Sequence, residues 1–270
     1  MRRNSILSLS LVLLLGSLVL GGCATGKIHQ ATSVVDYLYT NEHDASAKPG
    51  VPKLELPLRI GIAFVPSIQP AQSSHSFLAF PTFNSGYALT EQQKMDLMLK
   101  VANHFKKYPF VDTIELIPSA YLTPRGGFAN LSELHTMYGI DVIALLSYDQ
   151  AQFTDESALS LTYLTVVGAY VVPGEKNDTH TMLDAAVYDI PSHKLLFRAP
   201  GTSQIRGRAT LANLSEQRRE HGEAGFKQAA AKMIENLDQQ LALFRRRAEA
   251  RPDVYKIVRP PNYDPNALRQ

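Results

Sequence analysis

Apolar residues in the first half of the chain follow two patterns. Almost continuous apolar runs, typical of strands buried on both faces of a sheet, occupy residues 58–65, 110–117 and 141–148. Between these runs, apolar residues recur every three or four positions, which predicts helices. The first helix begins after Thr90, with Gln93 at the capping-box position. The second spans residues 131–138, begins after Asn130 and ends at Gly139. This alternation predicts a sheet with two crossover helices.

The second half of the chain changes to long strand patterns separated by turn residues. We expect a strand over 158–172, a loop at 173–178 and a partner strand over 179–190. A turn at 191–194 leads into a further strand over 195–199, extending to about residue 205. Strands joined in succession by turns pair antiparallel, so we expect consecutive antiparallel hairpins.

An amphipathic pattern over residues 215–250 predicts a long C-terminal helix. Gly222 and Gly225 are expected to fray or kink its first turns. Residues 251–270, rich in proline and charge, are expected to form an extended tail. The predicted fold class is therefore α/β (α+β), with one domain over 58–250 built on a mixed central sheet.

The first 22 residues have the order of a secretory signal peptide. Arg2 and Arg3 precede an apolar run over residues 6–20, which is shorter than the roughly 20 residues that a transmembrane helix needs. The alternative is an uncleaved anchor helix, which this length disfavours.

Leu20-Gly21-Gly22-Cys23 resembles the lipobox of bacterial lipoproteins. The resemblance implies cleavage after Gly22 and attachment of lipid to Cys23, so that the partner of the mature N-terminus is membrane lipid. The residue after the cysteine is Ala24 rather than aspartate, which by the same resemblance implies the outer membrane with the domain facing the periplasm. Exposure at the cell surface stays an alternative.

Residues 23–57 are expected to form the lipid anchor and a tether. The stretch 41–52 is rich in Ala, Ser, Pro, Gly and charge, a composition typical of linkers. Apolar residues within 34–39 interrupt it, and we expect them to dock on the domain as a short element.

Charge and cysteine content exclude several classes of protein. Without residues 1–22 the chain has 25 basic and 25 acidic side chains, which argues against a general nucleic-acid binder. Cys23 is the only cysteine, so a mature chain that carries lipid there has no disulfide and no thiol-based metal site. Basic residues gather between 245 and 259, either as a solvated helix end or as a contact for anionic lipid or peptidoglycan.

The sequence contains no hydrolase, P-loop or zinc-protease motif, and it predicts no cofactor, no catalytic residue and no metal. One polar group stands out: Asp178, His180 and Asp184 alternate along a predicted strand and project to one face. They form either a polar sheet face or a histidine–carboxylate site for a metal or for acid–base chemistry.

Several stretches resemble the rhombotail (rhombosortase-associated) lipoproteins, a proteobacterial family. They are residues 58–66, 110–121, 137–154, 166–181 and 184–202. The resemblance implies a lipoprotein and brings no defined biochemical activity. The chain departs from the sorting tail of that family, because it ends in Arg259-Pro260-Pro261-Asn262-Tyr263 and seven further residues. The element order is also similar to the periplasmic α/β domain of TolB-type and CsgG-type lipoproteins.

These observations predict a non-enzymatic envelope lipoprotein that binds or scaffolds another envelope protein or a cell-wall component. Two alternatives stay open. One is a periplasmic metal-dependent hydrolase that uses Asp178, His180 and their neighbours. The other is a subunit of an export or assembly complex.

Overall fold

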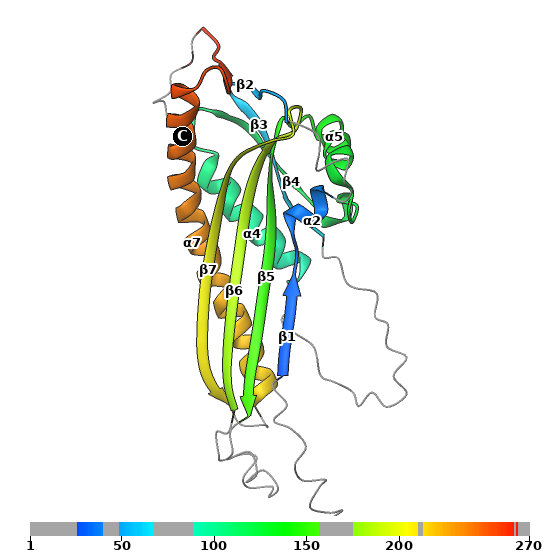
Figure 1. Ribbon diagram of the computed structural model, residues 1–270, viewed down its shortest axis with the longest axis vertical. Coiled ribbons are helices and arrows are strands. Elements are labelled where there is room, and N and C mark those ends of the chain that lie inside the picture. The colour runs from blue at the N-terminus through cyan, green and yellow to red at the C-terminus, as the bar shows by residue number, and fades with distance from the viewer. Residues whose placement is uncertain are drawn as a thin grey trace, which may run out of the picture.

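The computed structural model describes residues 26–39, 49–66, 89–156, 175–209, 213–261 and 263. Its elements, in chain order, are β1 (Gly26–Ala31), α2 (Val34–Leu38), β2 (Lys53–Glu55), β3 (Leu58–Phe64), α4 (Glu91–Phe105), β4 (Val111–Ile117), a 3-10 turn (Ser119–Tyr121), α5 (Gly127–Tyr138), β5 (Val142–Glu156), β6 (Glu175–Asp189), β7 (Lys194–Ala209), α7 (Leu214–Ala250) and β8 (Lys256–Val258). The predicted α/β class, with a mixed sheet and a long C-terminal helix, is confirmed (Figure 1). Among these residues, no helix has both the length and the apolar character to cross a bilayer.

The sheet has the strand order β4-β3-β5-β6-β7. Strands β4, β3 and β5 are parallel, and α4 and α5 make the two crossovers between them, as the alternating pattern predicts. Strands β6 and β7 continue the sheet antiparallel. β1 also pairs with β5, antiparallel, along the segment that β3 does not reach.

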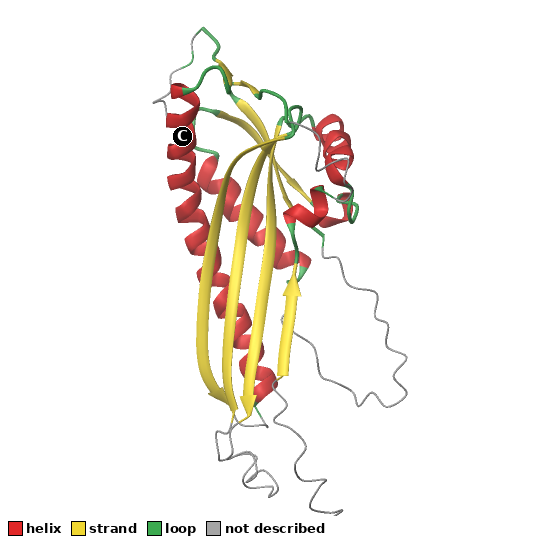
Figure 2. Cartoon of the chain, viewed as in Figure 1, coloured by secondary structure: helices red, strands yellow, loops and turns green. Residues whose placement is uncertain are grey.

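Two apolar clusters cover the two faces of the sheet, because the strands alternate their side chains. On β6, Leu183, Ala185 and Val187 face α4 and α7, whereas Ala186 and Tyr188 face α2 and α5. The broad end of the molecule, which contains β3, β4, α4 and α5, therefore has three layers (Figure 2). The narrow end, formed by β1 and the paired segments 149–156, 175–182 and 202–209, has α7 on one face of the sheet only (Figure 2).

The second half differs from the predicted hairpins. β6 pairs with β5 over fifteen residues, from Val142–Asp189 to Glu156–Glu175, and the expected strand 158–172 lies outside the described residues. Residues 175–178, expected in a loop, belong to β6. β5 continues to Glu156 rather than ending at 148, because Gln150 and Gln152 donate to the Gly222 and Arg218 carbonyls of α7 and the backbone pairs on both sides.

Helix boundaries differ where side chains find tertiary partners. The capping box of Thr90 and Gln93 is confirmed, as is the left-handed Gly139 that ends α5 at φ 64°. Asn130, however, lies inside α5 rather than before it. Its amide accepts hydrogen bonds from the Tyr37 hydroxyl at 2.8 Å and from the Thr123 backbone N–H at 2.9 Å. The Asn130 side chain therefore belongs to a buried hydrogen-bond network and does not cap the helix.

Part of the segment expected to be a tether belongs to the folded domain. β1 lies within it, and α2 docks with Val34, Tyr37 and Leu38 buried, as expected for residues 34–39. β2 pairs in parallel with β8, so residues 53–55 and 256–258 form a small second sheet. The C-terminal tail is therefore held by backbone pairing at residues 256–258.

Candidate functional site

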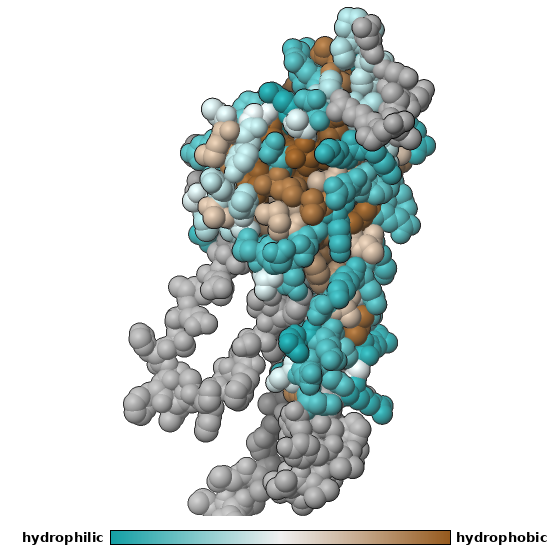
Figure 3. Space-filling model, turned by 180° about the vertical axis from the view of Figure 1, so that it is seen from behind, coloured by the Kyte–Doolittle hydropathy of each residue, from teal (hydrophilic) through white to brown (hydrophobic). Residues whose placement is uncertain are grey.

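An apolar cavity of about 460 Å³ lies between the sheet, α4, α7 and the β2–β8 pair. Its floor is formed by side chains of the parallel strands, among them Ile60, Ile62, Val142 and Ala144. On the rear face of the molecule, apolar residues gather in the upper half and are bordered by hydrophilic ones (Figure 3). A cavity of this size falls in the range typical of small-molecule sites.

The two helices that flank the cavity are joined beside it. His104 Nε2 of α4 lies 2.8 Å from Asp238 Oδ2 of α7, and the Tyr108 hydroxyl donates to Asp238 Oδ1 at 3.3 Å. Burial, followed by the nearby Asp238 carboxylate, raises the pKa of Tyr108. Beyond this bridge, Phe105 of α4 and Leu241 of α7 line the cavity walls. The bridge thus fixes the separation of the helices at one end of the cavity.

Aromatic and aliphatic side chains close the end of the cavity near the C-terminus. Leu54 and Ile257, from the paired strands β2 and β8, both line it. Phe244 packs edge-on against Tyr255, with ring centroids 5.3 Å apart, and lies 5.6 Å from Phe197. The pairing of β2 with β8 therefore builds a wall that neither strand could form by itself.

Among the described residues that line the cavity, three are charged: Arg245, Glu249 and Arg259. Arg259 Nη2 lies 3.7 Å from Glu249 Oε1, and both side chains are more than half exposed. Such an exposed pair is held weakly, so its arginine can exchange partners at little cost. The site therefore combines an apolar interior with a rim of two cations and one anion, a composition suited to binding rather than to acid–base chemistry.

The predicted polar group lies elsewhere, on the face of β6 opposite α7. His180 Nε2 and Asp178 Oδ1 are 3.3 Å apart, and Asp178 also accepts hydrogen bonds from Gln204 and lies 3.6 Å from Arg206 Nε. Among the described residues, no three histidine, cysteine or carboxylate side chains gather as a metal site would require.

Asp184 projects to the same face, as predicted, but does not join that pair. Four residues separate it from His180, which corresponds to about 13 Å along a strand. It is buried, and Arg198 Nε donates to its Oδ2 at 2.6 Å. Burial raises the pKa of Asp184, and the Arg198 guanidinium opposes this shift. The strand therefore separates the three residues into two ion-pair groups.

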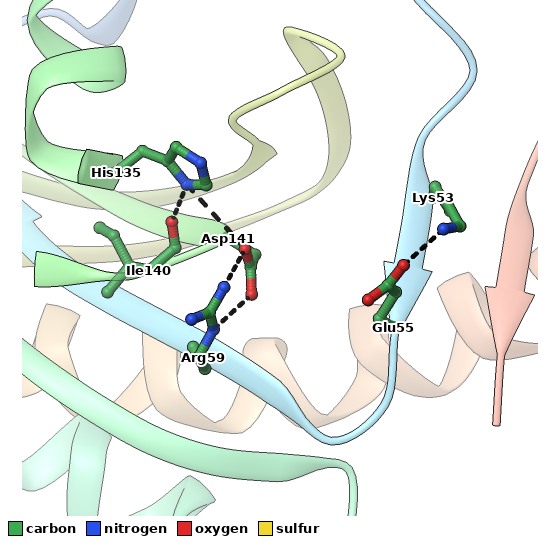
Figure 4. Close-up of polar contacts among 6 residues, drawn as sticks. All are labelled: Lys53, Glu55, Arg59, His135, Ile140 and Asp141. Carbon is green, nitrogen blue, oxygen red and sulfur yellow. Dashed lines mark hydrogen bonds and ion pairs between the residues drawn. The ribbon is translucent and has the colours of Figure 1, made fainter. Parts of the chain in front are cut away.

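A second polar cluster lies where β3 and β5 begin (Figure 4). Arg59 donates through Nε and Nη2 to the two oxygens of Asp141, both at 2.8 Å. The His135 ring contacts the carbonyl of Ile140 and lies 3.9 Å from Asp141. A bidentate pair of this kind fixes the relative position of two parallel strands, which is a structural role.

The predicted lipid site, Cys23 with cleavage at Gly22, lies outside the described residues. β1 begins at Gly26, so only Ala24 and Thr25 separate Cys23 from the sheet.

Sequence reasoning missed the cavity, since its walls come from segments far apart in the chain. The available signal was the basic group between residues 245 and 259, of which Arg245 and Arg259 lie at the rim. The sequence alone did not show that these arginines border an apolar hollow.

Comparisons with known proteins do not assign this chain to a family. Neither a protein-family model nor a curated protein matches it. Solved structures that match include the PelC dodecamer from Paraburkholderia phytofirmans, with 9% identity and a TM-score of 0.28, over 78% of this chain and 96% of that one. A single-substitution variant of the same PelC matches with 9% identity and a TM-score of 0.29 over the same shares. Similarity at this level carries no argument about fold or function.

Proposed function

We propose that this chain is a lipid-anchored protein of the bacterial envelope whose domain acts as a non-enzymatic binding component. The observation that carries the proposal is the apolar cavity with its charged rim. Burying apolar surface is favourable by roughly 25 cal/mol per Å², so an apolar group of an envelope component that enters the cavity is stabilised by the surface it removes from water.

The anchor supports a defined orientation. Because β1 starts three residues after Cys23 and Gly26 pairs with Thr154, lipid at Cys23 holds the narrow end of the sheet at the membrane. Val142, which lines the cavity, lies on β5 twelve residues from Thr154, a distance of about 40 Å along the strand. The cavity would then face the periplasm and remain accessible to components that are not in the bilayer.

The binding part of the proposal is tested by photocrosslinking in intact cells. A crosslinking amino acid placed at Arg245, on the cavity rim, is expected to capture a discrete envelope component that mass spectrometry can identify. The matched control carries the same amino acid at Arg219, an exposed arginine near the start of the same helix. Equal capture at the two positions would contradict a binding role for the cavity.

The anchoring part has a separate test. Cys23→Ser is expected to move the protein from the membrane fraction to the soluble periplasmic fraction, because two or more acyl chains are needed for stable attachment. Retention of the Cys23→Ser protein in the membrane fraction would contradict lipid anchoring at this cysteine.

A further inference from the structure

We propose that the cavity binds the aliphatic chain of a long-chain fatty acid, with the carboxylate held at the rim by Arg245 and Arg259. The inference rests on the proposed binding function and specifies its ligand. It follows from three properties of the cavity: its apolar walls, its size and the charges at its rim.

The walls favour an alkyl chain over a peptide. Eighteen of the 22 lining residues in the described part of the chain are apolar, and the other four are Tyr263 and the three charged residues, Arg245, Glu249 and Arg259. A peptide segment that entered in an extended form would bring backbone N–H and C=O groups that these walls cannot satisfy, at several kcal/mol for each group. A helix, about 10 Å across with its side chains, is too wide for a cavity of about 460 Å³ enclosed by two helices and a sheet.

The rim favours an anionic head group. Two arginines and one glutamate border the opening, and Glu249 Oε1 lies 3.7 Å from Arg259 Nη2, which is longer than a hydrogen bond. Guanidinium groups bind carboxylates in a bidentate manner, and a carboxylate can replace this weak pair. A neutral amphiphile would gain no such contact.

Segments of this chain fit the cavity less well. The seven residues after Tyr263 contain one large apolar side chain, Leu268, beside Asp264 and Arg269. Lipid carried at Cys23 would start near Gly26, at the opposite end of β5 from Val142. A separate alkyl chain therefore fits these walls better than either of these two parts of the chain.

The test uses the chain from Ala24 onward, which contains every described residue and lacks the predicted site of lipid attachment. After removal of co-purified lipid, calorimetric titration with dodecanoate below its micelle concentration is expected to show saturable binding of one molecule per chain. Tetradecanoate is expected to bind about fourfold more tightly for each added methylene that is buried. Dodecanol, which has the same chain and no charge, is expected to bind about tenfold more weakly than dodecanoate.

Two pairs of variants connect this binding to the cavity. Arg245→Ala is expected to reduce the preference for dodecanoate over dodecanol, whereas Arg246→Ala, which removes the adjacent exposed arginine outside the lining, is expected to keep it. Ala144→Leu places a side chain in the cavity and is expected to weaken dodecanoate binding at least tenfold without lowering the melting temperature. Ala185→Leu, buried on the same face but outside the lining, is expected to lower the melting temperature by overpacking.

The absence of saturable dodecanoate binding by a chain that unfolds cooperatively would overturn the inference. So would binding that neither Ala144→Leu nor Arg245→Ala changes, because it would then occur elsewhere. Equal affinity for dodecanol would overturn the role of the rim arginines. If crosslinking at Arg245 captures an envelope protein while dodecanoate does not bind, the fatty-acid inference fails and the proposed function stands. If both experiments fail, the proposed function fails with it.

Discussion

Asp184 shows how single residues set the polar face of this sheet. The residue is 6% exposed, and its Oδ1 atom has no hydrogen-bond partner in the described part of the chain. The Arg198 guanidinium is the group that compensates its charge. By contrast, the pair of Asp178 and Arg206 lies in solvent, with the arginine 75% exposed. Two ion pairs on one sheet face therefore make very different contributions to the free energy of unfolding.

Arg198→Ala is expected to lower the free energy of unfolding by about 2 kcal/mol at pH 7, because it leaves a buried carboxylate without its cation. The folded-state pKa of Asp184 already lies above its ordinary 3.8, so this group costs stability as the pH rises through that raised pKa. Loss of Arg198 raises the pKa further. The stability loss should therefore be smaller at pH 4.5 than at pH 7, as measured by urea unfolding at both values.

Arg206→Ala is the matched control on the same strand and face. Since Arg206 is exposed, its removal should change the free energy of unfolding by less than about 0.5 kcal/mol at either pH. An equal loss for Arg198→Ala at both pH values would show that Asp184 does not carry the effect.

At the scale of elements, α7 holds the molecule together because it packs directly on backbone. A Cβ atom at Gly201 of β7 would lie 2.1 Å from the carbonyl oxygen of Ala229, and one at Gly225 of α7 would lie 2.5 Å from Thr181 Oγ1. Gly222 and Gly225 do not fray the helix, which is continuous from Leu214 to Ala250. Glycine lowers the stability of a helix, but here this cost is offset because the absence of a side chain allows the helix to pack closely on the sheet.

Gly201→Ala is expected to destabilise the protein by about 3 kcal/mol, because the new methyl group meets helix backbone that cannot move independently. Gly50→Ala is the matched control, since a Cβ there would make ordinary contact with Ser192 at 3.4 Å. It should change stability by less than about 0.5 kcal/mol. Chemical denaturation of the two variants gives the comparison, and similar stabilities would contradict the close packing at Gly201.

At the scale of the whole molecule, the fold separates its two ends. β1 and the start of α7 lie at the narrow end, and the cavity and the end of α7 lie at the broad end (Figure 1). Arg219 and Arg247, both exposed on α7, are 28 residues apart, or about 42 Å along the helix. With lipid at Cys23, this length would place the cavity well above the membrane surface.

Arg219→Cys and Arg247→Cys test this orientation as a matched pair. A lipidated Cys23 leaves no other thiol in the chain, so each variant can be labelled with one fluorophore. In liposomes that contain a quencher on the lipid head groups, the label at position 219 should be quenched several-fold more than the label at 247. Equal quenching would contradict attachment of the narrow end to the bilayer.

The sequence by itself determined the elements whose signals are local. Thr90 with Gln93, the parallel strands with their crossover helices, and the helix end at Gly139 follow from capping chemistry and apolar periodicity over a few residues. The lipobox at Cys23 is also a local signal, and it stays a prediction.

The tertiary structure decided what depends on contacts between distant segments. The extension of β5 beyond Tyr148, the pairing of β1 with β5 and that of β2 with β8 satisfy backbone groups whose partners are far away in the chain. The pairing of Asp184 with Arg198 and the cavity rim at Arg245 and Arg259 likewise appear only when strands and helices pack. Periodicity shows which residues face a core. Packing decides which residues they contact there and whether these fill the space between the elements or leave a cavity.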